Sequence, residues 1–541
     1  MTSSSTTDRL STGIVGLDRI LEGGFLRNAV YIAEGPPGAG KTMLASQLCF
    51  HNARQGERAL YVTLLAESHE RMLTHLSRMD FYDPALVPDG VYFISAFRAL
   101  HQDGLPALLR LLRDAIIERK ATVLVLDGMV TAEEISLARA PSANALTQDA
   151  GSSQHFKQFI HELQSVCSMT SCTVLLLSST ERPRLFHPAY TMVDGILELT
   201  NELAGLKTIR QIHVRKMRGT DQVLGKHAFD IGPAGVVVHP RIESLRELER
   251  EETGDDATAD DAPRIPFGIP QLDTMLSGGL PERSVTMIVG PTGTGKTLLG
   301  LQYLAEGARR GEPGVYFGFF ERPSALLTKS RRLSLGLDEG ERAGLVEIVW
   351  QRPIEAVIDV LADRLFTTVR KLSAKRLVLD GIQGFEQALD DYPDRLRGVF
   401  ASLTDELERL GVTTLYTVET RELFGPTIEI PVSGVSAATQ NIILTRHVEL
   451  QSRLNLLLSI IKVRDSHFDR TVRELVIGDG GLHVADAFGA DTHVLAASAL
   501  QPIPSPPPRK QKRSRPAAAK QSTAAAPKPK TPARKTGKRK R

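Results

Sequence analysis

Hydrophobic residues along the chain alternate between short continuous runs and helical stripes. Residues 29–33, 121–126 and 173–177 are apolar runs with the length of buried strands. Between them, leucine and isoleucine recur every three or four positions within residues 105–117, and a second stripe extends from Phe156 to Val166. This alternation of strands and helices predicts an α/β fold, a mainly parallel sheet covered by helices on both faces.

The same pattern occurs twice, because the chain carries an internal repeat. Two landmarks recur 255 residues later (268 against 13, and 290 against 35), and a third recurs after 253 residues (380 against 127). The landmarks are Gly13–Gly24 and Gly268–Gly279, Gly35–Thr42 and Gly290–Thr297, and Leu124–Asp127 and Leu377–Asp380. A repeat of this length predicts two tandem copies of one domain.

Composition places the boundaries of these copies. At 541 residues the chain exceeds what one core usually fills. We expect a first domain at 8–242, a charged linker at 243–264, a second domain at 265–490, and a tail at 495–541. The tail is rich in Ala, Pro, Lys and Arg and has no aromatic residue, so it is expected to be disordered.

Charge is distributed unevenly along the chain. The net charge is +3, but residues 501–541 hold 14 Lys or Arg and no Asp or Glu, leaving 52 basic against 63 acidic residues elsewhere. A basic tail of this kind could bind nucleic acid or an acidic partner. The polar N-terminus, the short apolar runs and three cysteines without metal-ligand spacing favour a cytoplasmic protein that does not enter the membrane.

Both copies contain a GxxxxGK[ST] sequence between an apolar strand and a helical pattern, which is the setting of a phosphate-binding loop for ATP. Its glycines let the backbone N–H groups approach the phosphates. Lys41 and Lys296 can reach the β- and γ-phosphates, and the hydroxyls of Thr42 and Thr297 can bind Mg²⁺. The candidate glycines are Gly35, Gly38 and Gly40 in the first copy and Gly290, Gly293 and Gly295 in the second.

Asp127 and Asp380 each end an apolar strand about 90 residues after the first glycine of their loop. An acidic residue at that position can hold magnesium through the metal's water ligands. A solvated aspartate at a strand end is the alternative interpretation.

In the order of these motifs the sequence resembles the KaiC family of RecA-like ATPases, over about residues 8 to 490. The resemblance rests on Thr12–Asp18, the two phosphate loops, the two aspartates, Ser179–Arg182, Lys216–Thr220 and Lys462–Arg464. It implies tandem RecA-like domains, a double-ring homohexamer, and ATP bound between subunits. It also implies that Lys216, Arg218, Lys462 and Arg464 reach the γ-phosphate of a neighbouring subunit; each pair of charges would share one face of a strand.

Both copies depart from the family pattern of two adjacent glutamates at the end of the strand that follows the loop helix. Phe320 replaces the first glutamate of the second copy, and Glu321 remains. In the first copy Leu65 and Ala66 occupy the pair, with Glu67 one position late. Glu67 and Glu321 are the candidate bases that would activate water.

The family's second domain can also phosphorylate itself at an adjacent Ser-Thr pair. Here Ser436 is a candidate phosphoacceptor, but Ala437 stands where the threonine is expected. The sequence therefore predicts, at most, weak serine autokinase activity.

Three functions fit these features. The first is an ATP-hydrolysing regulatory hexamer that reports its nucleotide state to an unidentified protein partner, in signalling or clock-like control. The second is a RecA-like nucleic-acid-associated ATPase that uses the basic tail. The third is a nucleotide-gated scaffold with little hydrolysis.

Overall fold

The structure is a computed structural model. It describes residues 9–65, 69–138, 145–180, 188–204, 207–245, 263–352, 357–420, 439–450, 453–464 and 466–487. The predicted tail, most of the predicted linker, Glu67 and Ser436 lie outside these residues. The domain limits set from composition stay predictions.

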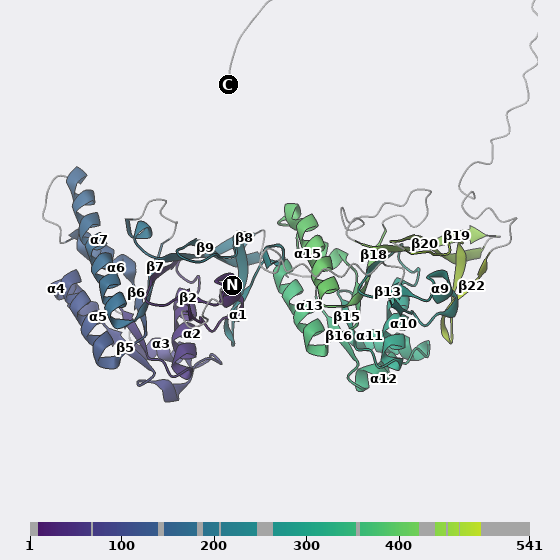
Figure 1. Cartoon of the computed structure of the whole chain (residues 1–541), viewed down its shortest axis with the longest axis horizontal. Coiled ribbons are helices and arrows are strands. Elements are labelled where there is room, and N and C mark those ends of the chain that lie inside the picture. Colours follow the sequence, from purple (N-terminus) through teal and green to yellow (C-terminus); the bar gives the residue numbers. More distant parts are fainter. Residues whose placement is uncertain are drawn as a thin grey trace, which may run out of the picture. The chain divides into compact units, whose positions relative to one another are not determined.

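A nine-stranded sheet forms the centre of the first domain, in the order β11-β10-β9-β8-β3-β7-β6-β4-β5 (Figure 1). The strands from β5 to β8 in this order pair in parallel, whereas β8, β9, β10 and β11 pair antiparallel. The bounds are β3 (Val30–Gly35), β4 (Ala59–Thr63), β5 (Val91–Ser95), β6 (Val123–Asp127), β7 (Thr173–Ser179), β8 (Gly195–Ala204), β9 (Lys207–Met217), β10 (Lys226–Gly232) and β11 (Gly235–His239).

Helices cover both faces of this sheet because successive residues of the central strand point to opposite sides. Tyr31 and Ala33 of β3 pack in the core beneath α2, and Val30 and Ile32 pack in the core beneath α5 and α7. The helices are α1 (Val15–Ile20), α2 (Lys41–Arg54), α3 (His69–Leu76), α4 (Phe97–Asp103), α5 (Leu105–Arg119), α6 (Met129–Ala138), α7 (Ala145–Thr170) and α8 (Ile242–Leu245), with 3₁₀ turns η2 (Pro84–Leu86) and η3 (Pro188–Thr191).

The second domain repeats this topology strand for strand, in the order β16-β15-β17-β18-β14-β19-β20-β21-β22. The strands from β16 to β19 pair in parallel and the rest antiparallel. The bounds are β14 (Val285–Gly290), β15 (Gly314–Gly318), β16 (Val346–Trp350), β17 (Arg376–Asp380), β18 (Thr413–Glu419), β19 (Asn441–Leu450), β20 (Arg453–Val463), β21 (Arg473–Gly478) and β22 (Gly481–Ala487). The predicted fold, two tandem RecA-like α/β domains with mainly parallel sheets, is confirmed.

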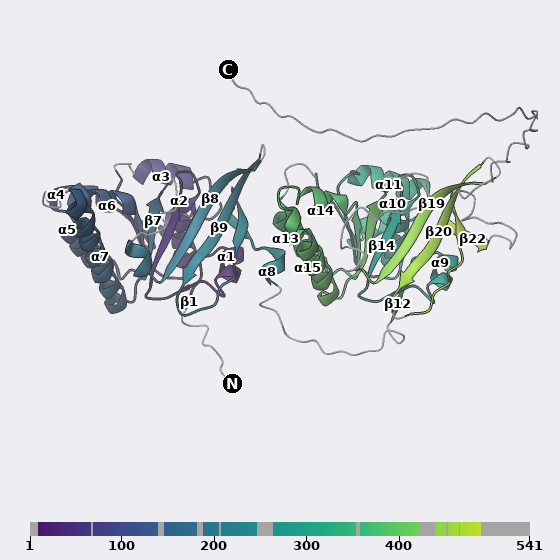
Figure 2. The same cartoon turned by 90° about the horizontal axis from the view of Figure 1, so that it is seen from above.

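The helices of the second domain occupy the corresponding places. Figures 1 and 2 show α13 and α15 together against one side of its sheet. The helices are α9 (Pro270–Met275), α10 (Lys296–Arg309), α11 (Pro323–Arg332), α12 (Leu337–Arg342), α13 (Ile358–Leu372), α14 (Gln383–Gln387) and α15 (Leu396–Arg409), with the 3₁₀ turn η5 (Pro393–Arg395). None of the described helices is long and apolar enough to cross a membrane.

The repeated motif at the start of each domain folds around one aspartate. Asp18 accepts hydrogen bonds from the backbone N–H and the hydroxyl of Thr12, at 2.8 and 2.7 Å. Asp273 accepts from the backbone N–H of Phe267 at 2.7 Å. Beside each aspartate lies a two-stranded sheet, β1 (Arg9–Leu10) with β2 (Phe25–Leu26) and β12 (Arg264–Ile265) with β13 (Leu280–Pro281).

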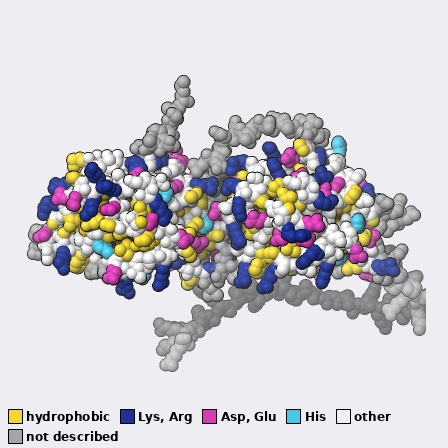
Figure 3. All heavy atoms as spheres, turned by 90° about the horizontal axis from the view of Figure 1, so that it is seen from below, with side chains coloured by type: hydrophobic (Ala, Val, Ile, Leu, Met, Phe, Trp, Pro, Cys, Tyr) yellow, Lys and Arg dark blue, Asp and Glu magenta, His cyan; other side chains and the backbone are white. Residues whose placement is uncertain are grey.

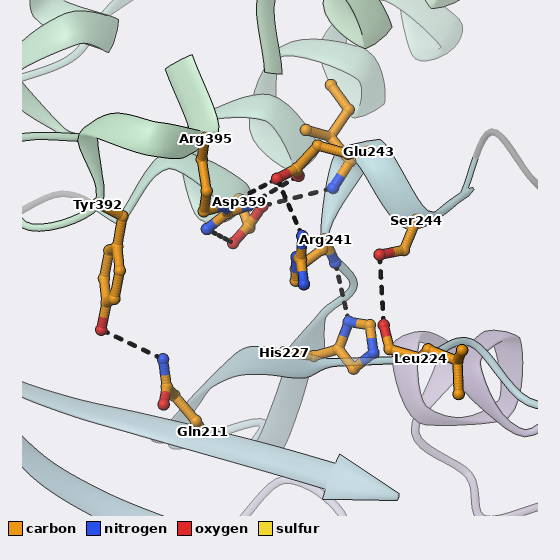
Figure 4. A network of polar contacts seen from close by, with 10 residues as sticks. Gln211, Leu224, His227, Arg241, Glu243, Ser244, Asp359, Tyr392 and Arg395 are labelled. Atoms are coloured by element: carbon orange, nitrogen blue, oxygen red, sulfur yellow. Dashed lines mark hydrogen bonds and ion pairs between the residues drawn. The ribbon is translucent and has the colours of Figure 1, made fainter. Parts of the chain in front are cut away.

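The end of the first domain contacts the second through a short polar network (Figure 4). Ile242 of α8 is buried in the core formed by α13 and α15. Beside it, the Arg395 guanidinium donates to Glu243 at 2.7 and 2.8 Å and to buried Asp359 at 2.7 and 3.1 Å. Burial raises the pKa of Asp359 despite the opposing effect of Arg395. Glu243, which composition assigns to the linker, is therefore held by the second domain.

A buried arginine holds the strand that carries Asp380 in place. The Arg376 side chain, fully buried at the start of β17, donates to Glu312 at 2.7 Å and to the carbonyls of Pro266 and Tyr303 at 2.7 and 2.9 Å. Gly307 of α10 makes room for it, because a Cβ there would lie 2.5 Å from the Arg376 Cδ.

We expect Arg376→Ala to lower the unfolding free energy of the second domain by about 3 kcal/mol, since it leaves buried polar partners unpaired. Trp350, the single tryptophan of the chain, lies in β16 and reports on this domain during urea unfolding. The matched control is Arg342→Ala, which removes an exposed arginine paired with Asp338 and should cost about 0.5 kcal/mol or less. Equal losses in the two variants would contradict this role of Arg376.

Candidate functional site: two phosphate-binding loops

Each phosphate-binding loop connects the central strand of its sheet to a long helix. In the first domain β3 ends at Gly35 and α2 begins at Lys41; in the second, β14 ends at Gly290 and α10 begins at Lys296. The residue before each helix, Gly40 or Gly295, has a positive φ of 99° or 82°. This left-handed conformation favours glycine and aims the first N–H groups of the helix into the loop.

The loop lysines fold back over their own loops. The Lys41 Nζ donates to the carbonyls of Gly35 and Pro36 at 2.8 and 2.9 Å. The Lys296 Nζ donates to the corresponding carbonyls, those of Gly290 and Pro291, at 2.8 and 2.7 Å. Burial lowers the pKa of both ammonium groups; Asp127 opposes that shift at Lys41, and Glu419 and then Asp380 oppose it at Lys296. Each loop therefore holds a positive charge among its own backbone groups, where the phosphates of a nucleotide would bind.

The next residue of each helix meets the aspartate that the sequence singled out. The Thr42 hydroxyl donates to Asp127 Oδ2 at 3.3 Å, and the Thr297 hydroxyl donates to Asp380 Oδ2 at 2.9 Å. The aspartates end β6 and β17, so they lie at the carboxyl edge of the sheet with the loops. A hydroxyl and a carboxylate at this separation are hard oxygen ligands that suit Mg²⁺.

A cavity of about 400 Å³ opens over the loop of the first domain, which is within the usual size of ligand sites. Lys41, Thr42 and Asp127 line it, together with His69 and His75 of α3. Burial lowers the pKa of His69. Neither histidine could be predicted from the sequence, because nothing in their spacing shows that α3 turns toward the loop.

The predicted cations lie at or just beyond the C-terminal ends of β9 and β20, Lys216 and Arg218 in the first domain and Lys462 and Arg464 in the second. The Lys216 Nζ donates to the carbonyls of Tyr190 and Val193 at 2.7 and 2.6 Å, and Arg218 donates to that of Thr191 at 2.7 Å. In the second domain the Lys462 Nζ donates to the carbonyl of Thr439 at 2.8 Å, and the backbone N–H of Arg464 donates to that of Gln440. Within one chain Lys216, Arg218 and Lys462 therefore contact the turns that precede β8 and β19, and their role toward a neighbouring subunit stays a prediction.

A β-bulge in β9 sets the direction of Arg215, the residue before Lys216. The pairing of β8 with β9 skips Arg215, which turns to donate to Glu34 at 2.7 Å. Glu34 is only 1% exposed and directly precedes Gly35. This ion pair was not predicted from the sequence, although a glutamate between the apolar run 29–33 and the phosphate loop is a signal of a buried charge that needs a partner.

The candidate base of the second domain is already engaged by a cation. The Lys329 Nζ lies 2.6 Å from both carboxylate oxygens of Glu321. Phe320 is 61% exposed, and its ring lies over the backbone of Gly381, where an added Cβ would be 2.5 Å from the ring. An aromatic ring therefore lies next to Asp380, and Glu321 would have to leave Lys329 to accept a proton. Its role as base stays a prediction.

Comparison with known proteins agrees with this geometry. A family model described as "ATPase: KaiC" matches residues 10–243 and again residues 265–487. The circadian clock oscillator protein KaiC of Picosynechococcus sp. is 25% identical over 497 residues, covering 91% of this chain and 92% of its own. Circadian clock protein KaiC3 of Synechocystis sp. is 24% identical over 511 residues, covering 91% and 95%.

Proposed function

Since the chain belongs to the KaiC family of ATPases, we propose that each of its two domains binds Mg·ATP at its own phosphate-binding loop. The observation that carries this proposal is the repeated contact between a loop threonine and the aspartate at the end of a neighbouring strand. A lysine folded over the loop accompanies it in both domains.

The residues of each site have separate tasks. Lys41 or Lys296 would exchange its loop carbonyls for the β- and γ-phosphates, and the adjacent threonine hydroxyl would keep its hydrogen bond to the aspartate while its lone pair faces the metal. Mg²⁺ held by the threonine and the aspartate would supply positive charge that stabilises the negative charge developing on the phosphates. The exposed loop backbone orients the triphosphate through its N–H groups.

Hydrolysis in the second domain should be slow. General-base catalysis needs a carboxylate within reach of the attacking water, and Phe320 can accept no proton. Glu321 is held in an ion pair with Lys329. These contacts favour a second candidate function, a nucleotide-gated scaffold in which the second domain holds ATP with little turnover. They also argue against rapid autophosphorylation of Ser436.

We further propose that the chain works as a cytoplasmic homohexamer in signalling or clock-like control, with ATP between subunits and a regulatory protein as partner. The relatives named above are circadian clock proteins by name. Lys216, Arg218, Lys462 and Arg464 are the residues proposed to act across the subunit interface. On the face seen in Figure 3, acidic and basic side chains are interspersed. The alternative of nucleic-acid binding rests on the basic tail, with its 14 Lys or Arg.

The slow second site can be tested with Phe320→Glu. In a Lys41→Ala chain, which leaves only the second loop, this change restores a carboxylate and should raise steady-state ATP hydrolysis by about 10-fold or more. Phosphorylation of Ser436, followed by mass spectrometry, should rise with it. Phe320→Gln is the matched control, since it is polar but cannot act as a base. Rapid, near-stoichiometric phosphorylation of Ser436 in the unmodified protein, abolished by Lys296→Ala, would show that Phe320 does not limit the site.

Action across subunits can be tested by mixing variants. Arg218→Ala should lower hydrolysis by about 10-fold or more, as loss of an arginine that stabilises the γ-phosphate does, and Arg464→Ala should lower it in the second domain. Mixing Arg218→Ala with Lys41→Ala chains should restore part of the activity, because each supplies what the other lacks. Lys226→Ala, which removes an exposed lysine paired with Glu202, is the control. Sedimentation that finds only monomers at saturating ATP would refute the hexamer.

A further inference from the structure

A buried tyrosine touches the magnesium-binding aspartate in each domain. Tyr61 on β4 donates its hydroxyl proton to Asp127 Oδ2 at 2.8 Å. Tyr316 on β15 donates to Asp380 Oδ2 in the same way. Their side chains are 0% and 1% exposed. In both sites the tyrosine and the loop threonine therefore share one carboxylate oxygen.

Strand register explains how the tyrosine reaches this oxygen. Thr63 pairs with Asp127, and Gly318 pairs with Asp380. Tyr61 and Tyr316 precede these paired residues by two positions, so each tyrosine lies on the same face of the sheet as its aspartate. In the second domain the ring lies across Gly318, where an added Cβ would be only 2.5 Å from the Tyr316 Cε1. The two domains thus keep the contact between tyrosine and aspartate, although the residue that pairs with the aspartate is Thr63 in one and Gly318 in the other.

We propose that Tyr61 and Tyr316 are positioning residues that fix the aspartate for magnesium, and so set the Mg²⁺ affinity of each nucleotide site. The inference rests on the proposed binding of Mg·ATP by both domains. A hydroxyl that donates to one carboxylate oxygen restricts rotation of the carboxylate and keeps it facing the loop threonine. Groups that orient a ligand in this way contribute 10- to 100-fold to metal affinity in other proteins.

The chemistry of the tyrosines suits this task. A phenolic hydroxyl is a hydrogen-bond donor at neutral pH. Both tyrosines donate to the carboxylate of the aspartate.

In the second domain a threonine contacts the other carboxylate oxygen of the aspartate. In the second domain Thr417 on β18 donates to Asp380 Oδ1 and accepts from the backbone N–H of Gly381 at 2.8 Å. The matching position on β7 is Leu177, a buried apolar residue without a hydroxyl. Asp380 is thus held at both oxygens, by Tyr316 at one and by Thr417 at the other.

The test measures Mg²⁺ dependence with a fluorescent ATP analogue on the full chain. Tyr61→Phe is made in a Lys296→Ala chain and Tyr316→Phe in a Lys41→Ala chain, so that one site reports at a time. We expect the Mg²⁺ concentration for half-maximal binding to rise about 10-fold for each variant. Binding of the analogue in EDTA should not change.

Two tyrosines supply matched controls. Tyr31→Phe removes a buried hydroxyl that donates to the Leu26 carbonyl, and Tyr416→Phe removes one that lies 3.5 Å from the Thr404 hydroxyl. Neither should alter the Mg²⁺ requirement. Gly318→Ala should shift it in the same direction as Tyr316→Phe, since the added Cβ displaces the Tyr316 ring.

The outcomes separate the inference from the proposed function. An unchanged Mg²⁺ requirement in both tyrosine variants would overturn the inference, as would weaker binding in EDTA or a melting temperature lowered beyond that of the controls. Binding that shows no Mg²⁺ dependence in the parent chains would instead overturn the proposed Mg·ATP site, and the inference with it.

Discussion

The arrangement of the site depends on one constraint, the parallel register of the strands beside the central strand of each sheet. Because these strands run in one direction, the loop after β3 and the aspartate at the end of β6 leave the sheet at the same edge. The first turn of α2 then brings the Thr42 hydroxyl to Asp127. The same geometry recurs for β14, β17 and α10, so one topological rule generates both sites.

The two domains keep this framework and differ in the residues around it. The first has an ion pair between Glu34 and Arg215 next to its loop, whereas Val289 and Ile461 stand at the corresponding places in the second. The second has Arg376 at the start of the aspartate strand, where the first has Val123. In the second, the Phe320 ring lies beside Gly381 and Glu321 is paired with Lys329. The loop lysine, the loop threonine and the aspartate make the same contacts in both domains.

Much of this could be predicted from the sequence because the relevant signals are local. The apolar runs 29–33, 121–126 and 173–177 became β3, β6 and β7, and the stripe at 105–117 became α5. Sequence could not show that Tyr61 meets Asp127, because the contact depends on the register of strands 66 residues apart. Nor could it show the antiparallel extension from β8 to β11, or the bulge that turns Arg215 toward Glu34, since these arise from pairing between distant segments.

The central claim is that two independent nucleotide sites lie on one chain. The most direct measurement is the number of ATP molecules bound per chain at saturating Mg·ATP, obtained by isothermal titration on the unmodified protein and on Lys41→Ala and Lys296→Ala. We predict two per chain in the unmodified protein and one in either variant. One nucleotide per chain in the unmodified protein would contradict the account.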